Sequence, residues 1–187
     1  MKSKVLILFS LVLCMCACTD SASVRDAKGA YRFKTTGKVT IEENYAGATK
    51  GDILVANLDN ESGSLELVSL HDGDSLLMTI DRLNGEVVAT KGTVGNGRLS
   101  FVPYNRTLEV PTTVKYYDTL NIGIGILSKD TVIVRERHEY EVYDITVSGS
   151  AQVYDNNLVF DLKYTGASQT SERTLRSTGI KCLAKKN

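Results

Sequence analysis

The chain has 187 residues, and its 22 Lys and Arg side chains balance its 22 Asp and Glu side chains. A net charge of zero provides no basic field to hold nucleic acid, so that class of partner is excluded. At this length a single domain with its own hydrophobic core is the default expectation.

The N-terminal segment has the pattern of a signal peptide. Lys2 and Lys4 precede an apolar run over 5–13, which is too short to span a bilayer. The run closes with the letters MCAC at 15–18, where a small residue stands directly before a cysteine. This arrangement resembles the lipobox of bacterial lipoproteins.

The resemblance implies cleavage before Cys18, with lipid on its sulfur and on its new amine. We therefore predict a signal peptide over 1–17 and a lipidated Cys18 that opens a flexible tether over 18–28. Several acyl chains would anchor the protein in the membrane without a transmembrane helix. The expected location is the outer membrane of the cell envelope, with the periplasmic and the surface face both open. Cys16 is the rival lipidation site, and a secretion signal without lipid is the alternative.

Lipidation leaves Cys182 as the only thiol of the mature chain. One thiol excludes both a disulfide framework and a cysteine metal site. Cys182 alternates with Ile180 and Ala184, which predicts a small buried core residue rather than a nucleophile.

Alternating apolar and polar residues predict strands from Gly29 to the end of the chain. The first is a long strand over 31–42 with a bend at Gly37. From residue 51 onward, turn signals recur at roughly the 8–12-residue spacing of an antiparallel meander. Later strands are predicted over 131–153, 158–164 and 174–183. A bulge or break is predicted near Tyr143, because the apolar positions change parity there.

The segment 112–142 admits several structures. Pro103 and Pro111 favour a short edge strand between them. A short helix fits 112–120, and a surface hairpin arm fits the whole segment. Isoleucine alternates with glycine over 121–126, which predicts a close backbone approach or a sharp bend.

About eight to ten predicted strands follow Gly29-Ala30-Tyr31. This pattern is similar to a lipocalin-like (calycin-like) small β-barrel, a domain of unknown role in many lipoproteins of Bacteroides-type bacteria. We expect an all-β antiparallel meander that closes into such a barrel over 29–187, with a two-sheet β-sandwich as the alternative. Lipocalins carry Gly-x-Trp on the first strand, whereas this chain has Gly29-x-Tyr31 and no tryptophan.

The sequence offers few groups for catalysis. His71 lies in a predicted turn and His138 in a charged run, and neither is placed beside a nucleophile. The chain has no Gly-x-Ser-x-Gly elbow, His-Glu-x-x-His motif or phosphate loop. The turn over 72–74 lacks the glutamate and spacing of a calcium loop. We therefore predict no catalytic residue, no metal site, no cofactor and no enzymatic activity.

Two functions fit these observations. The first is an envelope lipoprotein that binds a small apolar or amphipathic ligand in its barrel, through residues that the sequence does not identify. The alternative is an interaction module that presents its loops or the segment 112–142 to a glycan or protein partner. An open apolar cavity would favour the first, and a solid core with an outer tyrosine patch the second. The tyrosines considered for that patch are Tyr116, Tyr117, Tyr140 and Tyr143.

Overall fold

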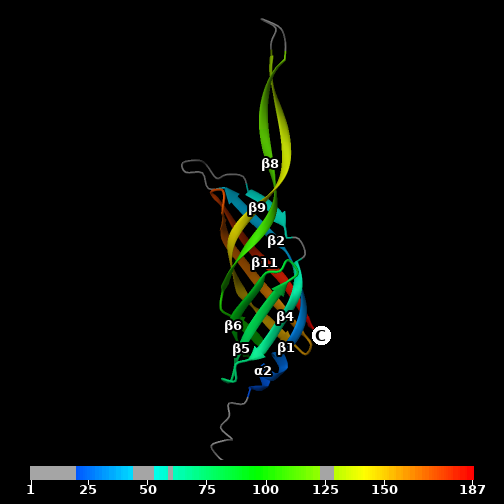
Figure 1. Cartoon of the computed structure of the whole chain (residues 1–187), viewed down its shortest axis with the longest axis vertical. Helices are drawn as coiled ribbons and strands as arrows, with labels where there is room; N and C mark the ends of the chain where they lie inside the picture. Colours follow the sequence, from blue (N-terminus) through cyan, green and yellow to red (C-terminus); the bar gives the residue numbers. More distant parts are fainter. Residues whose placement is uncertain (1–19, 44–52, 59–60, 123–128) are drawn as a thin grey trace, which may run out of the picture.

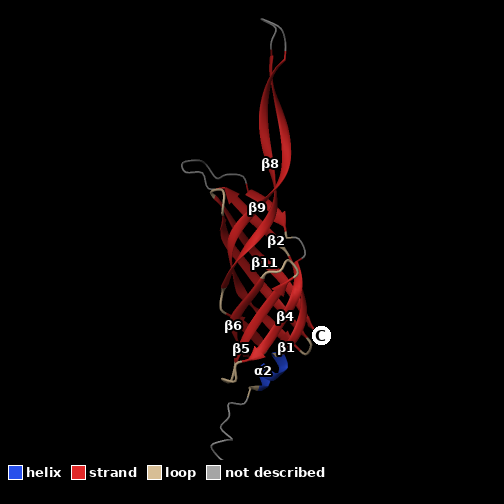
Figure 2. Cartoon of the chain, in the orientation of Figure 1, coloured by secondary structure: helices blue, strands red, loops and turns tan. Residues whose placement is uncertain are grey.

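A computed structural model gives the fold and describes residues 20–43, 53–58, 61–122 and 129–187. The described chain is almost entirely β-strand, with one short helix, α2 (Ala22–Ala27) (Figure 2). Figure 1 shows an elongated barrel with α2 at one end and a long two-stranded arm at the other. The all-β prediction is confirmed.

Eight antiparallel strands form a closed barrel. The wall closes where the first and last strands pair, from Tyr31↔Lys186 to Thr36↔Lys181. This closure confirms the predicted meander barrel and not the two-sheet sandwich. In order around the wall, the strands are β1 (Gly29–Thr36), β4 (Glu61–Ser69), β5 (Ser75–Arg82), β6 (Val87–Gly95), β7 (Arg98–Phe101), β9 (Lys129–Tyr154), β10 (Asn157–Ser168) and β11 (Arg173–Lys186).

Two further strands lengthen the wall on one side. β2 (Lys38–Glu43) continues the line of β1 after a bend at Gly37, as predicted, and pairs with β11 and with β3 (Ile53–Asn57). An ideal Cβ at Gly37 would lie 3.1 Å from the Cα of Ile180. The bend therefore brings two backbones closer than an ordinary side chain permits.

The barrel interior is filled by every second residue of each strand, because successive side chains point to opposite faces. In β5, Leu76, Met78 and Ile80 are buried, and the intervening residues are more exposed. The same alternation places Cys182 inside the barrel, as expected. Arg82 takes the next inward position of β5 and is only 6% exposed.

The predicted bulge near Tyr143 is wrong. β9 keeps one continuous register with β8 (Tyr104–Ile122) through this point, and its register with β10 is continuous up to Ser168↔Tyr143. The inward face simply continues from Tyr143 to Glu141, whose carboxylate is buried in place of an apolar group. The register shift in this region lies instead between β10 and β11, where Gly179 has a φ of 83°.

The tether predicted over 18–28 is corrected, because α2 occupies most of it. The side chains of Val24 and Ala27 are fully buried in the core. The Ser21 side chain accepts a hydrogen bond from the N–H of Val24 and caps the helix. The Tyr31 hydroxyl donates to the Ala27 carbonyl at 2.6 Å. The helix is thus part of the folded domain and covers one end of the barrel (Figure 1).

The arm is a two-stranded ribbon of β8 and β9. The two strands pair without a break from Tyr104↔Val147 to Ile122↔Lys129. The hairpin arm considered for 112–142 is confirmed, and the short helix over 112–120 is wrong. Pro111 lies within β8, opposite Tyr140. Most of the predicted Ile–Gly bend lies outside the described residues.

Candidate functional site

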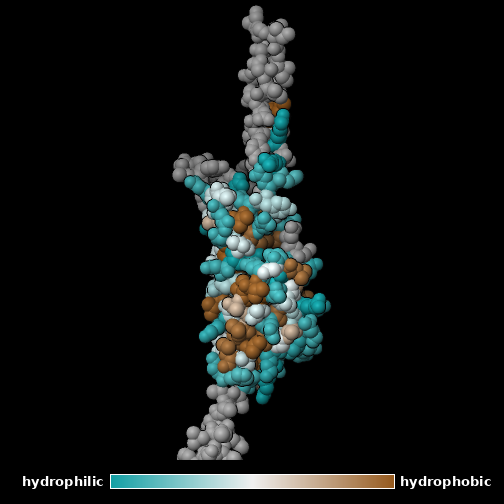
Figure 3. Space-filling view, in the orientation of Figure 1, coloured by the Kyte–Doolittle hydropathy of each residue, from teal (hydrophilic) through white to brown (hydrophobic). Residues whose placement is uncertain are grey.

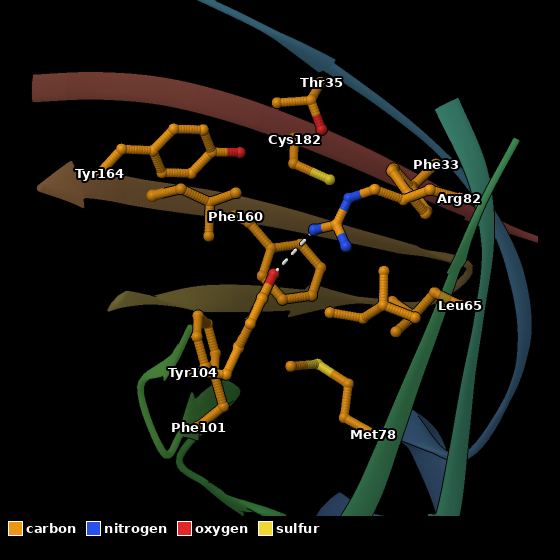
Figure 4. Close-up of a pocket in the computed structure, with 12 residues that line it drawn as sticks. Phe33, Thr35, Leu65, Met78, Arg82, Phe101, Tyr104, Phe160, Tyr164 and Cys182 are labelled. Carbon is orange, nitrogen blue, oxygen red and sulfur yellow. Dashed lines mark hydrogen bonds between the residues drawn. The ribbon is translucent and has the colours of Figure 1, made fainter. Parts of the chain in front are cut away.

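A small cavity lies in the barrel and is lined by residues from seven strands (Figure 4). About 30 Å³ of it is open to the centre of a water molecule. That space suffices for a few heavy atoms, well below the pockets of drug-sized ligands. Its apolar walls are Phe33, Leu65, Met78, Ile80, Phe101, Phe160 and Leu162, and its polar lining groups are Thr35, Arg82, Tyr104, Tyr164 and Cys182.

Aromatic rings form one wall of the cavity. The ring centroid of Phe101 lies 6.0 Å from that of Tyr104 and 6.2 Å from that of Phe160, in tilted arrangements. Such pairs hold one another in place beyond their simple area burial. The wall is therefore a firm apolar surface rather than a loose collection of side chains.

Arg82 brings a positive charge to this apolar space. Its Nη2 donates to the Tyr104 hydroxyl at 3.0 Å, and its Nη1 lies 3.5 Å from a carboxylate oxygen of Glu86. Its Nε has no hydrogen-bond partner, and it is the one such buried side-chain nitrogen or oxygen in the described part of the chain. A buried donor left unpaired costs about 1–3 kcal/mol, more when charged, so this atom calls for an acceptor.

A second arginine completes an ion-pair network at this level of the barrel. Arg106, whose side chain is 1% exposed, donates from Nη1 and Nη2 to the two carboxylate oxygens of Glu61. Its Nε lies 3.4 Å from the same Glu86 oxygen that Arg82 approaches. Two guanidinium groups thus meet two carboxylates, and the cluster is electrically balanced.

Burial keeps the lining hydroxyl and thiol groups protonated. It raises the pKa of Tyr104 and, more strongly, that of Tyr164. It also raises the pKa of Cys182 to about 11, against the opposing effect of a hydrogen bond with Thr35. At neutral pH the cavity therefore contains a thiol, not a thiolate nucleophile.

A second buried polar cluster lies where the arm leaves the barrel. The Glu141 carboxylate accepts from the hydroxyls of Ser168 and Ser171 at 2.5 Å each. It also accepts from the Tyr143 hydroxyl at 2.9 Å and from Arg173 Nη1 at 3.0 Å. Burial alone would raise the pKa of Glu141, but these four donors together hold it below its usual value. The cluster fixes the β10–β11 loop to the base of the arm.

The two histidines considered for catalysis lie in different parts of the molecule. His71 is exposed in the β4–β5 turn, with Nδ1 3.4 Å from the Asp20 carboxylate, and His138 is exposed on the arm. Within the described residues, no group of three or more His, Cys, Asp or Glu could hold a metal ion. Cys18 lies outside the described residues, so its lipidation stays a prediction.

The tyrosines considered for an outer patch differ in their exposure to solvent. Tyr143 is fully buried beside Glu141, so it cannot contact a partner. Tyr140 is 70% exposed on the arm. The side chains of Tyr116 and Tyr117 lie outside what the structure describes.

Sequence reasoning missed Arg82, Arg106 and their carboxylate partners. A signal for them was present. Arg82 follows Leu76, Met78 and Ile80 at the same parity, so it had to point inward on an unbroken strand.

Comparison with known protein families, with curated proteins and with solved structures gave no match. The described residues include no helix that is long and apolar enough to cross a bilayer. The fold and the cavity define a closed eight-stranded antiparallel barrel with a small, mainly apolar cavity that Arg82 helps to line.

Proposed function

We propose that this chain is a lipid-anchored, non-enzymatic protein of the cell envelope whose barrel binds a small amphipathic molecule. The observation that carries the proposal is the unpaired Arg82 Nε beside an apolar cavity. A bound oxygen acceptor would satisfy this donor, and an apolar remainder would lie along Phe101 and Phe160. The cluster around Arg82 is balanced in charge, so a carbonyl oxygen fits it as well as a carboxylate.

The size of the cavity restricts the ligand. Space for only a few heavy atoms fits a short chain, such as a four-carbon acid or amide, better than a long fatty acyl chain. Longer chains would require the aromatic wall to open, which is costly in a close-packed interior. Short amphipathic molecules are therefore the class we propose.

Native mass spectrometry of the full chain, purified gently from its own host, tests for the natural ligand. We expect a small added mass that is lost on denaturation and is reduced in Arg82→Lys. Arg98→Lys is the control, because Arg98 is exposed on the outer wall and bonded to Ser150. A bare polypeptide mass in the wild type would count against the proposal.

Nuclear magnetic resonance tests defined probes. The Arg82 Nε–H resonance, assigned by its loss in Arg82→Lys, should shift saturably with butyrate or butyramide. Hexadecanoate should leave it in place. No shift with either short probe, at concentrations up to tens of millimolar, would contradict binding of short amphipathic molecules at Arg82.

The arm supports a second candidate function. It extends from the barrel end opposite α2, as Figure 1 shows, and so away from the end nearest the predicted lipid at Cys18. On the face of the barrel that Figure 3 shows, apolar side chains lie in separate groups broken by polar ones. We propose that the arm, more than the barrel wall, presents this protein to a glycan or protein partner.

A further inference from the structure

One edge of β9 has no described strand beside it beyond the point where β10 ends. β10 pairs with β9 from Asn157↔Tyr154 to Ser168↔Tyr143, and the Gln169 N–H then donates to the Val142 carbonyl at 2.9 Å. Farther out along the arm, no described strand pairs with this side of β9. The edge is therefore a direct continuation of an established strand–strand interface.

The direction of the main-chain groups along this edge follows from two observations. The Val142 carbonyl is directed toward β10. The main-chain N–H and C=O groups of even-numbered β9 residues in this part of the strand therefore point away from β8. Pro111 has no N–H, and it lies opposite Tyr140, at a position where antiparallel strands exchange no hydrogen bonds. Both observations indicate that the N–H and C=O of Tyr140 lie on the edge of β9 that is turned away from β8.

The two edges of the arm are not equivalent. Pro111 interrupts the outer edge of β8, because it removes a donor that a further strand would need. The β9 edge carries no proline along the arm. Its exposed side chains include Val132 at 59% and Tyr140 at 70%. A long, proline-free edge is a template for an added strand.

We propose that the β9 edge outward of Val142 accepts an extended segment of a partner protein as an added antiparallel strand, in line with β10. This inference rests on the arm's proposed role as the docking surface and names the partner's chemistry. Main-chain hydrogen bonds supply the affinity, and pockets between alternate side chains supply the preference for sequence. The barrel ligand is not involved, since Arg82 lies in a different part of the molecule.

Photo-crosslinking in the native host tests the proposal with the full chain. A photoactivatable phenylalanine at Val132 should capture a discrete partner. In the same chain, Tyr140→Pro removes the outward N–H and should reduce capture at least tenfold. Tyr140→Ala keeps that N–H and removes only the ring, so it should leave capture within twofold. Thr113→Pro blocks the β8 edge and should also leave it unchanged, and equal urea midpoints would verify that each variant folds.

Each other outcome overturns the inference in a distinguishable way. Equal loss in Tyr140→Ala and Tyr140→Pro would show that the ring, not the main chain, makes the contact, as expected for a stacked glycan or side chain. Capture that survives Tyr140→Pro, or that is lost in Thr113→Pro alone, would overturn strand addition at this edge but keep the arm as a docking surface. No capture in any variant would overturn both.

Discussion

Charged side chains at inward positions form the polar centre of this barrel. Arg82 and Arg106 are buried, and the Glu61 side chain that pairs with Arg106 is 17% exposed. Removing one member of a buried ion pair is costly because it leaves the other charge buried and alone. The network around Arg106 should therefore respond strongly to single substitutions.

We expect Glu61→Gln to lower the free energy of unfolding by about 3 kcal/mol, because it removes the carboxylate that Arg106 contacts through two nitrogens. A urea titration followed by circular dichroism measures this change. Asp161→Asn is the control, since Asp161 pairs with Lys181 on the surface and both side chains are 59% exposed. Equal midpoints for the two variants would contradict the role of Glu61 as the partner of the buried Arg106.

Cys182 should make stability depend on pH at alkaline values. Its folded pKa of about 11 lies above the usual value of 9.0, so the folded state keeps the proton longer than the unfolded state. The resulting stabilisation is complete below pH 9 and is lost as pH rises toward 11. Between pH 8.5 and 10.5 the wild type should lose more stability than Cys182→Ala. Parallel pH profiles of the urea midpoints would contradict this prediction.

The strands were largely predictable because their alternation is local. The bend at Gly37 and the antiparallel meander that closes into a barrel both follow from the spacing of turn signals and from the inward apolar sets, whereas the place of β2 and β3 beside β11 was not predicted. The bulge prediction near Tyr143 failed because a charge at an inward position was taken as evidence of an outward one. Glu141 is inward since three side chains beyond its own strand, those of Ser168, Ser171 and Arg173, supply its hydrogen bonds.

Helix α2 and the cavity depended on information that no short window contains. The six residues of α2 are too few to show a clear helical period. They are helical because Val24 and Ala27 pack into the barrel end. The cavity arises where residues from seven strands meet. Its unpaired Arg82 Nε follows from that packing, not from neighbouring letters in the sequence.

At the level of the strand, the bend at Gly37 should tolerate no larger residue. We expect Gly37→Ala to destabilise the barrel by about 1–3 kcal/mol, because the new methyl group would lie 3.0 Å from Ile180 Cγ1. Gly95→Ala is the matched control, since nothing lies within 4 Å of its added carbon. Thermal unfolding of both variants measures the difference, and similar melting temperatures would show that Ile180 moves aside freely.

On the scale of the whole molecule, the barrel has two dissimilar ends. α2 covers one end, and the arm extends from the other (Figure 1). Outward of Val142↔Glu109 the ribbon of β8 and β9 spans about 45 Å, at ~3.3 Å per residue. A lipid near α2 would therefore place the exposed part of the arm far from the bilayer.

Lipid attachment is tested by labelling cells with radioactive palmitate. We expect Cys18→Ala to abolish incorporation and to release the chain from the membrane fraction, because the lipid is its proposed anchor. Cys16→Ala should retain the label. Label that persists in Cys18→Ala would contradict the assignment, and its loss in Cys16→Ala alone would assign the rival site.

The fastening of Asp20 has a mechanical consequence. Its carboxylate accepts from the Ser69 hydroxyl and from Lys28 Nζ, and the N–H of Ser21 donates to the Gly73 carbonyl. Only Thr19 separates this fastened residue from Cys18. With a lipid at Cys18, a single residue would link the membrane anchor to the folded domain. With so short a linker, the domain could rotate and diffuse along the membrane, but its distance from the bilayer could change little. The arm would then reach partners only within a narrow range of distances from the bilayer.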